Sequence, residues 1–435
     1  MKITSLKFIA ILFMGLVFKN SATAQFEFNG QLVQRVEYRH GYGKLIPDTV
    51  DPSAFISQRL RFQFTYNTKY VKLFASIQDV RTWGSTSQLN ATDNLLSMHE
   101  GWAEIPIDTM WSVKIGRQEL VYDNSRFLGN VDWSMQARSH DFALLKFSKN
   151  DHKLHIGGGY NQDAETIYGG DYYKTANQYK TAQMLWYNYK HNDLELSILF
   201  WNNGKQDTTT GHRAVRYSQT IGLPTIKYSF MKNNLVSAFA YYQTGKDVNN
   251  RDLSCYDISI QGAQTFDINA EKISTFKVTL GVEMLSGTNT NNTANTNNSY
   301  NPMYGTNHMY NGYMDYFYVS GRFENSVGLN DLYLKFRYDM NKKWFAQTDL
   351  HYFLTNANVY NANDVLSQQL GAELDLTGGY VFNENISLQA GYSQLFASST
   401  IKYLESSSAS KTQNWAYLML IVRPKSDKKF IGIYN

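Results

Sequence analysis

The chain has 435 residues, a formal net charge of +4 and one cysteine, Cys255. Lys2, Lys7 and Lys19 account for three of its 41 basic residues, so the chain beyond residue 24 holds 38 basic residues against 37 acidic ones. This near-neutral balance gives no ground for a nucleic-acid partner, and none is expected. A lone cysteine excludes an internal disulfide framework and a redox-active thiol pair.

Residues 1–24 are predicted to be a secretory signal peptide. Lys2 and Lys7 form a basic start, residues 8–18 form an apolar run, and Ala22 to Ala24 supply small residues for cleavage before Gln25. The apolar run is too short to span a bilayer as a helix, and no later segment offers about twenty apolar residues. Any membrane crossing is therefore expected to be made by strands.

The residues that follow form a series of segments of about ten residues in which apolar and polar side chains alternate, a pattern typical of transmembrane strands. An even number of strands is expected when both ends of a bacterial barrel lie in the periplasm. The predicted strands are residues 26–40, 55–67, 70–83, 98–107, 111–122, 140–149, 152–161, 181–191, 194–203, 217–230, 235–245, 253–266, 273–286, 328–340, 343–355, 368–382, 386–397 and 414–423.

The connections between these strands fall into two kinds. Nearly all links after even-numbered strands are tight and rich in Asn and Asp, as at Asn150-Asp151 and Asn192-Asp193. Long polar loops follow several odd-numbered strands, notably residues 84–97, 123–139, 162–180, 287–327 and 398–413. We therefore predict an all-β fold, a transmembrane antiparallel β-barrel of about 18 strands with short periplasmic turns and long extracellular loops. The barrel is expected to cover residues 25–424, followed by a short polar C-terminal tail at residues 425–435.

Three segments depart from simple alternation. Pro224 lies inside a predicted strand and should require a bulge or a strand start nearby, because proline cannot donate to the ladder. The last strand is apolar on both faces, so its inner face is expected to pack against a loop. Within the loop at residues 287–327, the Tyr- and Gly-rich part at residues 304–318 is either a constriction or lid, or a simple surface loop.

Alternation also assigns the charged faces. Arg59 and Arg61 alternate with Leu60 and Phe62, and a charge facing lipid at the midplane costs about 2–4 kcal/mol, so the charged face should point into the lumen. The side chains predicted inside are Arg35, Arg39, Arg59 and Arg61 in the first two strands, and Lys335, Arg337, Asp349 and Glu373 in strands fourteen to sixteen. Rings of basic side chains favour anions in a pore, and opposing acidic side chains narrow the lumen. The alternative is that these charges only pair with one another and stiffen the wall.

Several motifs are similar to those of the alginate-export family of outer-membrane barrels. They occupy residues 78–84, 99–102, 116–122, 304–308, 312–316 and 328–331, with Arg126, Gly129 and Trp133 between them. The resemblance is strongest over residues 59–141, and it implies an eighteen-stranded barrel with an arginine-rich constriction that passes an anionic polysaccharide outward. By motif, Arg59, Arg61, Arg117 and Arg126 would form that constriction. Strict alternation places Arg117 on the lipid side, so this assignment requires a bulge at Gly116.

These observations predict an integral outer-membrane channel of a Gram-negative bacterium. Its cargo would be anionic solutes, including an alginate-like polysaccharide moving outward, with lipid and periplasmic export proteins as partners. A general diffusion porin is the alternative, and an outer-membrane hydrolase is a distant one. The histidines lack the spacing of a zinc site, and the chain has no nucleophile elbow, phosphate loop or dinucleotide fingerprint. Neither a cofactor, a metal nor an enzymatic activity is expected.

Overall fold

The computed structural model describes residues 25–90, 92–172, 178–207, 214–231, 233–269, 271, 273–318, 326–409, 412–424 and 426–433. The predicted signal peptide lies outside these residues. The long strands are β1 (Gln25–His40), β2 (Ser53–Asn67), β3 (Lys72–Thr82), β4 (Leu96–Pro106), β5 (Trp111–Gln118), β6 (His140–Lys149), β7 (His152–Tyr160), β8 (Thr181–His191), β9 (Leu194–Gln206), β10 (Val215–Phe230), β11 (Asn234–Lys246), β12 (Asp252–Asn269), β13 (Ser274–Leu285), β15 (Leu329–Met340), β16 (Trp344–Leu354), β19 (Gln369–Asn383), β20 (Ile386–Ala397) and β21 (Thr412–Val422).

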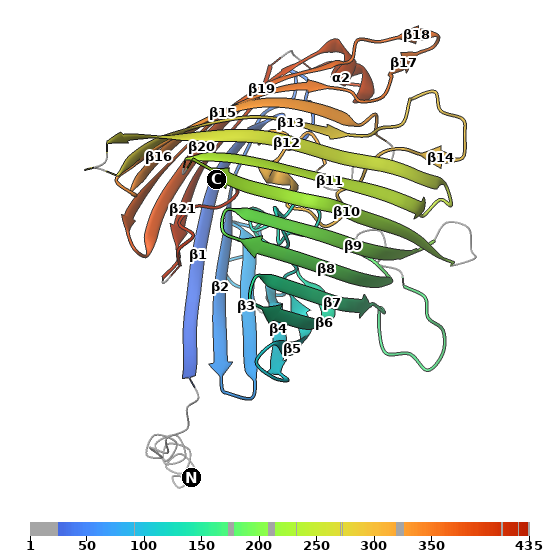
Figure 1. Cartoon of the computed structure of the whole chain (residues 1–435). Coiled ribbons are helices and arrows are strands. Elements are labelled where there is room, and N and C mark those ends of the chain that lie inside the picture. The colour runs from blue at the N-terminus through green and yellow to red at the C-terminus, as the bar shows by residue number, and fades with distance from the viewer. Residues whose placement is uncertain are drawn as a thin grey trace.

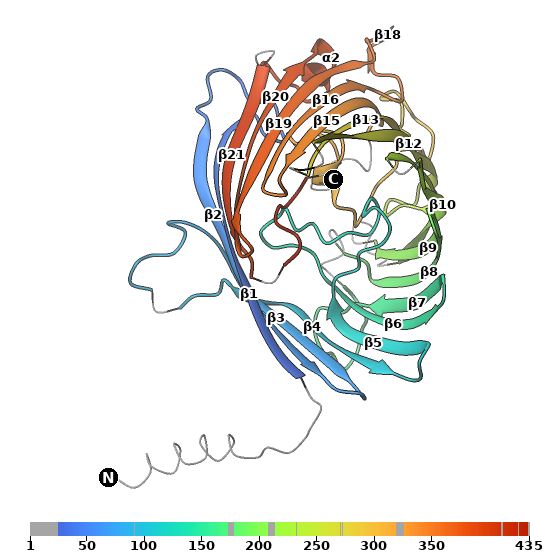
Figure 2. The same cartoon turned by 60° about the vertical axis from the view of Figure 1, so that its left-hand side comes forward.

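The long strands close into a barrel in which each strand pairs antiparallel with its neighbours in sequence (Figure 1). The seam lies between β1 and β21, whose register runs from Leu32 opposite Val422 to His40 opposite Asn414. The predicted fold class, an antiparallel barrel of about 18 strands, is confirmed. Figure 2 shows the ring of strands with several loops folded inside it.

The remaining elements are short and lie in the connections. They are β14 (Thr296–Asn297), β17 (Tyr360–Asn361), β18 (Asp364–Val365), the 3-10 helix η1 (Asn307–Met309) and the helix α2 (Ser399–Leu404). Among the described residues, no helix has the length and apolar character needed to cross a membrane.

The tight links predicted after even-numbered strands are present at one end of the barrel. Asn150, Asn192 and Asn341 begin three of them with φ angles of 52°, 49° and 55°. Asparagine adopts this left-handed conformation more readily than most residues, which explains its place in these turns. The opposite end carries the long connections, so the predicted division into short turns and long loops is confirmed.

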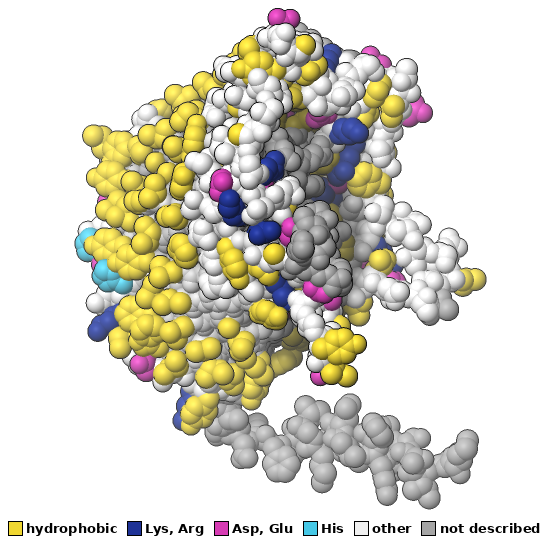
Figure 3. Space-filling model, turned by 90° about the vertical axis from the view of Figure 1, so that its right-hand side faces the viewer, with side chains coloured by type: hydrophobic (Ala, Val, Ile, Leu, Met, Phe, Trp, Pro, Cys, Tyr) yellow, Lys and Arg dark blue, Asp and Glu magenta, His cyan; other side chains and the backbone are white. Residues whose placement is uncertain are grey.

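The strand faces divide as the alternation predicts. In β2, the Arg59 and Arg61 side chains are buried inside the barrel, whereas Phe62 is exposed on the outer face. The exposed large hydrophobic residues are spread over nearly every long strand, and Figure 3 shows how they gather on the outer wall. An apolar outer band is what contact with lipid requires.

Two of the irregular segments behave as the sequence predicts. The register of β10 with both neighbours shifts around Pro224, between Gly222 and Thr225 on one side and between Leu223 and Ile226 on the other. The inner face of β21 is covered, because the ring of Trp133 from a lumen loop lies 5.6 Å from Trp415 and 5.0 Å from Tyr417. A bulge at Pro224 and a loop packed against the last strand are therefore both observed.

Replacement of Leu280 by Arg tests the outer face directly. Leu280 lies near the middle of β13 and is 66% exposed on the outer wall. We expect the variant to lose about 2–4 kcal/mol of unfolding free energy in lipid vesicles, because the charge would face hydrocarbon. Urea titration of the vesicle-embedded protein measures this loss.

The matched control is Ser237→Arg, which places the same side chain on the cavity wall of the neighbouring part of the barrel. An equal loss in both variants would contradict the assignment of the Leu280 face to lipid.

Candidate functional site: the charged lumen

A loop between β5 and β6, residues 119–139, crosses the lumen and is called here the first inner loop. Its side chains Leu120, Phe127 and Leu128 are buried. A second inner loop, residues 298–318, runs beside it through a parallel bridge between Leu128 and Tyr304. Backbone N–H groups of Gly129 and Thr306 each donate across the two loops at 2.9 Å. The Tyr-rich part of the long connection thus lies inside the barrel instead of on its surface.

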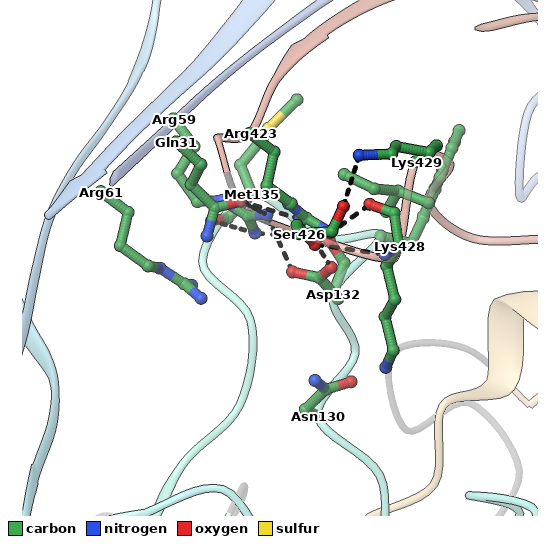
Figure 4. Close-up of polar contacts among 12 residues, drawn as sticks. Gln31, Arg59, Arg61, Asn130, Asp132, Met135, Arg423, Ser426, Lys428 and Lys429 are labelled. Carbon is green, nitrogen blue, oxygen red and sulfur yellow. Dashed lines mark hydrogen bonds and ion pairs between the residues drawn. The ribbon is translucent and has the colours of Figure 1, made fainter. Parts of the chain in front are cut away.

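Arginines of the β2 wall and of the chain after β21 hold one end of the first inner loop (Figure 4). Arg59 Nη2 donates to Asp132 Oδ1 at 2.8 Å, and Arg423 Nη2 donates to Asp132 Oδ2 at 3.1 Å. Arg59 also donates to the backbone oxygen of Met135 at 3.3 Å, and both arginines donate to Gln31 Oε1. One carboxylate therefore bridges two guanidinium groups, one from β2 and one from the residue that follows β21.

The pKa of Asp132 lies below its ordinary value. Burial raises the pKa of this carboxyl, but the opposing effect of the guanidinium groups of Arg59, Arg423 and Arg61 is larger. Asp132 is therefore ionised at neutral pH, and both ion pairs are intact there.

The opposite end of the first inner loop carries its own arginine. Arg126 is fully buried, and its Nε lies 2.6 Å from Glu283 Oε1 on β13 and 3.3 Å from Asp257 Oδ2 on β12. Its Nη2 donates to Asn311 Oδ1 of the second inner loop at 2.9 Å. The first inner loop is thus bound to the wall on both sides of the lumen. On one side the loop supplies the carboxylate of the ion pair, and on the other side it supplies the guanidinium group.

The other predicted arginines of β1 and β2 also face inward but have protein partners. Arg35 Nε and Arg39 Nη2 lie 2.8 Å and 2.7 Å from the two oxygens of Glu37. Arg35 also donates to the Trp133 backbone oxygen at 2.8 Å. Arg61 donates to Gln78 Oε1 at 2.6 Å. These contacts fit the pairing alternative, because the wall charges are largely satisfied within the protein.

Strands β15, β16 and β19 bring the remaining predicted residues inward. Lys335 Nζ lies 2.9 Å from Asp349 Oδ2, directly across the two strands. Arg337 forms two 2.8 Å hydrogen bonds to Asp339. Glu373 Oε1 accepts a 2.8 Å bond from the Met314 backbone N–H and so helps to hold the second inner loop.

Arg117 does not line the lumen, and its sequence-based assignment is corrected. The register of β5 with β4 and β6 runs without a shift, so Arg117 stays on the outer face with Ile115. There its Nη1 lies 3.0 Å from Asp141 Oδ2 in an exposed pair. Gly116 has a φ of +125°, and a Cβ added there would lie 2.3 Å from the Gly101 backbone oxygen. Close packing against β4, instead of a bulge, accounts for the glycine.

A cavity of about 660 Å³ lies beside the first inner loop, towards the end of the barrel that carries the tight turns. Lys227, Lys277, Arg337, Asp123 and Glu195 are among the charged side chains that line it, and Glu195 lies opposite Lys227 in the register of β9 and β10. Lys227 and Lys277 are not among the lumen residues predicted from the sequence. Lys277 alternates with Phe276 and Val278 just as Arg59 does with its neighbours, so the same pattern would have placed it inside.

One group of side chains in the described part of the chain has the composition of a metal site. Possible ligand atoms of His99, Glu100 and Glu119 lie within 4.8 Å of one another. His99 Nε2 lies 2.9 Å from Glu119 Oε1, Asn130 donates to Glu119 Oε2, and Arg61 Nη1 lies 4.0 Å from Glu119. The adjacent guanidinium opposes a cation, and the hydrogen bonds account for the carboxylates without one.

Comparison with known proteins places this lumen in an outer-membrane setting. Residues 25–167 match the model of a family described as alginate export, which confirms the resemblance over that part of the chain. The motifs between residues 304 and 331 lie outside the matched residues. No curated protein matches the chain.

Similar solved structures are outer-membrane barrels of low sequence identity. The outer membrane protein OpdK of Pseudomonas aeruginosa has 11% identity and a TM-score of 0.58, over 91% of this chain and 98% of that chain. Acinetobacter baumannii OccAB4 has 12% identity and a TM-score of 0.59, over 93% and 99%. Pseudomonas aeruginosa OpdO has 10% identity and a TM-score of 0.58, over 91% and 97%. The chain is an integral outer-membrane β-barrel.

Replacement of Arg59 by Met should loosen the first inner loop. The variant leaves three loop carbonyls without their donor and breaks one of the two ion pairs of Asp132. We expect a loss of about 3 kcal/mol in unfolding free energy and noisier single-channel currents. Planar-bilayer recordings measure the noise, and urea titration in vesicles measures the stability.

Arg117→Met is the matched control, because it removes the same side chain from the outer face. Its current noise should equal that of the unchanged protein. Equal noise in both variants would mean that Arg59 does not hold the loop.

The ion pairs of Asp132 should persist on acidification until the pH is low. Because its folded-state pKa is depressed, the stabilisation is fully present above the unfolded value of about 3.9 and is lost only as the pH falls below it. We expect current noise to stay constant from about pH 8 to pH 5. Noise that rises with a midpoint near pH 6 would contradict this assignment.

Proposed function

We propose that the protein is an outer-membrane channel that passes small anionic solutes. The observation that carries the proposal is the pairing of Lys277 with Arg337, which stand directly opposite each other on β13 and β15 and line the cavity. Like charges in directly opposed positions destabilise a sheet. A passing anion would relieve this repulsion, and basic side chains in a narrow passage favour anions.

The surroundings of this pair strengthen the argument. Asp339 binds Arg337, but among the described residues no carboxylate lies within 4.0 Å of Lys277 Nζ. Lys227 adds a third basic side chain to the same cavity. Glu195, its neighbour in register, lies 3.5 Å from Lys190. Positive charge is thus concentrated on one part of the cavity wall, which we call the basic wall (Lys227, Lys277 and Arg337).

The filled lumen favours small cargo. A barrel of about eighteen strands is wide enough for an aqueous channel, but here two inner loops occupy much of that space. Met309 and Tyr310 of the second inner loop line both this cavity and a much smaller pocket. A small carboxylate requires less displacement of these loops than a polymer does. OpdK, one of the similar structures, has been crystallised with vanillate, which is a small carboxylate and a suitable test solute.

The family match favours a second candidate, the outward passage of an anionic, alginate-like polysaccharide. Arg59, Arg61 and Arg126 all fall within the matched residues 25–167. A uronate polymer needs regularly spaced cationic contacts, yet these arginines are bound to the inner loops or to wall side chains. Polymer export would therefore require the first inner loop to move, and only this candidate calls for periplasmic export partners.

The ion preference of the channel tests the leading proposal. In a planar bilayer with a salt gradient, the reversal potential should indicate an anion preference. The double variant Lys277→Gln with Arg337→Gln should lower the anion-to-cation permeability ratio by about threefold, because two charges leave a narrow passage. Lys69→Gln is the control, since Lys69 lies in the tight turn between β2 and β3.

The same recordings separate the alternatives. A large current that is indifferent to ion charge and to the double variant would refute the anion proposal and indicate a general diffusion porin. Block by oligouronate that disappears in Arg59→Met would favour the polysaccharide. We expect no hydrolytic turnover from the purified barrel.

A further inference from the structure

The chain turns back into the barrel after its last strand. Residues 426–433, called here the post-barrel segment, lie inside the ring of strands in Figure 2, where their dark red trace continues from β21. Figure 4 places Ser426, Lys428 and Lys429 next to Asp132 and Arg423. The sequence predicts a polar tail here, but Ile431 and Ile433 are buried.

Side chains of β20 bind the backbone of the post-barrel segment. Gln389 donates through Nε2 to the Ile431 backbone oxygen at 2.9 Å and accepts from the Ile431 N–H at 3.0 Å. The Ser387 hydroxyl donates to the Lys429 backbone oxygen. Gln389 is fully buried, so loss of the segment would leave much of its amide without partners unless water replaces them.

The apolar contacts fit the segment closely to its groove. The rings of Phe430 and Phe345 on β16 lie 4.5 Å apart, edge to face. Gly432 has a φ of +74°, and a Cβ added there would lie 2.2 Å from Trp133 Cε3. Only glycine fits between this backbone and the first inner loop. The groove therefore joins the barrel wall to the loop that Arg59 and Arg423 hold.

The post-barrel segment also occupies the passage. Residues 427–433 line the 660 Å³ cavity together with the basic wall. The segment lies near Lys342, Val381 and Glu384, which belong to the end of the barrel with the tight turns. In barrels of this class that end faces the periplasm. Unlike the strands, the described part of the segment belongs to no ladder, so it can leave without breaking the sheet.

We propose that the post-barrel segment is a built-in plug of the periplasmic mouth, which narrows the channel while seated and opens it on release. The plug rests on the proposed channel activity for its readout but does not depend on anion preference. Its seat is the groove formed by Ser387, Gln389, Phe345 and Trp133. The plug regulates conductance, whereas the basic wall sets ion selectivity.

Unit conductance in planar bilayers tests the plug. A variant that lacks residues 426–435 should conduct about twofold or more above the unchanged protein, with the same sign of reversal potential. In the full chain, Gln389→Leu removes both bonds to Ile431 and should cause frequent transitions to the larger conductance. Gln394→Leu is the matched control on β20, because its side chain binds Leu395 and Gln413 instead of the segment.

A synthetic peptide of residues 426–435 provides an independent test. Added on the side of the tight turns, it should restore the lower conductance of the truncated channel, whereas a scrambled peptide should not. Unchanged conductance in both the truncated and the Gln389→Leu proteins, with no peptide block, would overturn the plug. If the truncated chain does not fold, the conductance of the full chain with Gln389→Leu tests the plug by itself. A rise in conductance without any anion preference would refute the selectivity proposal and leave the plug intact.

Discussion

The first inner loop depends on a salt-bridge arrangement that spans the barrel. On one side, Arg59 of β2 and Arg423, which follows β21, bind the loop carboxylate of Asp132. On the other side the polarity reverses, and loop Arg126 binds wall carboxylates of Asp257 and Glu283. Each buried charge has a partner, and such pairing is what makes charge tolerable away from water. The second inner loop and the post-barrel segment then pack against the loop held in this way.

This arrangement separates two uses of charge in the lumen. The arginines of β1 and β2 mostly form hydrogen bonds and ion pairs with other parts of the protein, and Arg59 is fully buried. Lys277 and Arg337, by contrast, stand opposite each other at the cavity, and Asp339 is the one carboxylate of the described residues that binds either of them. An abundance of arginine in a lumen is therefore a poor measure of selectivity. The charges that meet a solute are those that the protein leaves incompletely neutralised at an open surface.

Alternation of period two predicts the strands well because lipid and lumen impose opposite demands on the two faces. All the long strands, the tight Asn-rich turns and the irregularity at Pro224 were accessible in this way. The partners of the lumen charges were not, because Arg59 and Asp132 are 73 residues apart and meet only when a loop folds inward. Arg117 was misplaced because the glycine before it was interpreted as a bulge instead of a close contact with β4. The post-barrel segment was missed because three apolar residues and one glycine at residues 430–433 are too short a run to carry a strand signal.

The position of Arg423 has a consequence for how the molecule assembles. It follows the last residue of β21 directly, beside the seam where β21 meets β1, and its guanidinium reaches Asp132 on the first inner loop. The seam joins the two ends of a chain of strands, so it carries the largest loop-closure cost and is expected to form late. Asp132 of the first inner loop binds Arg59 on β2 as well as Arg423, so the loop connects the two sides of the seam. Correct packing of the first inner loop and closure of the β1–β21 seam are thus coupled. This coupling disfavours a closed barrel whose lumen lacks the loop.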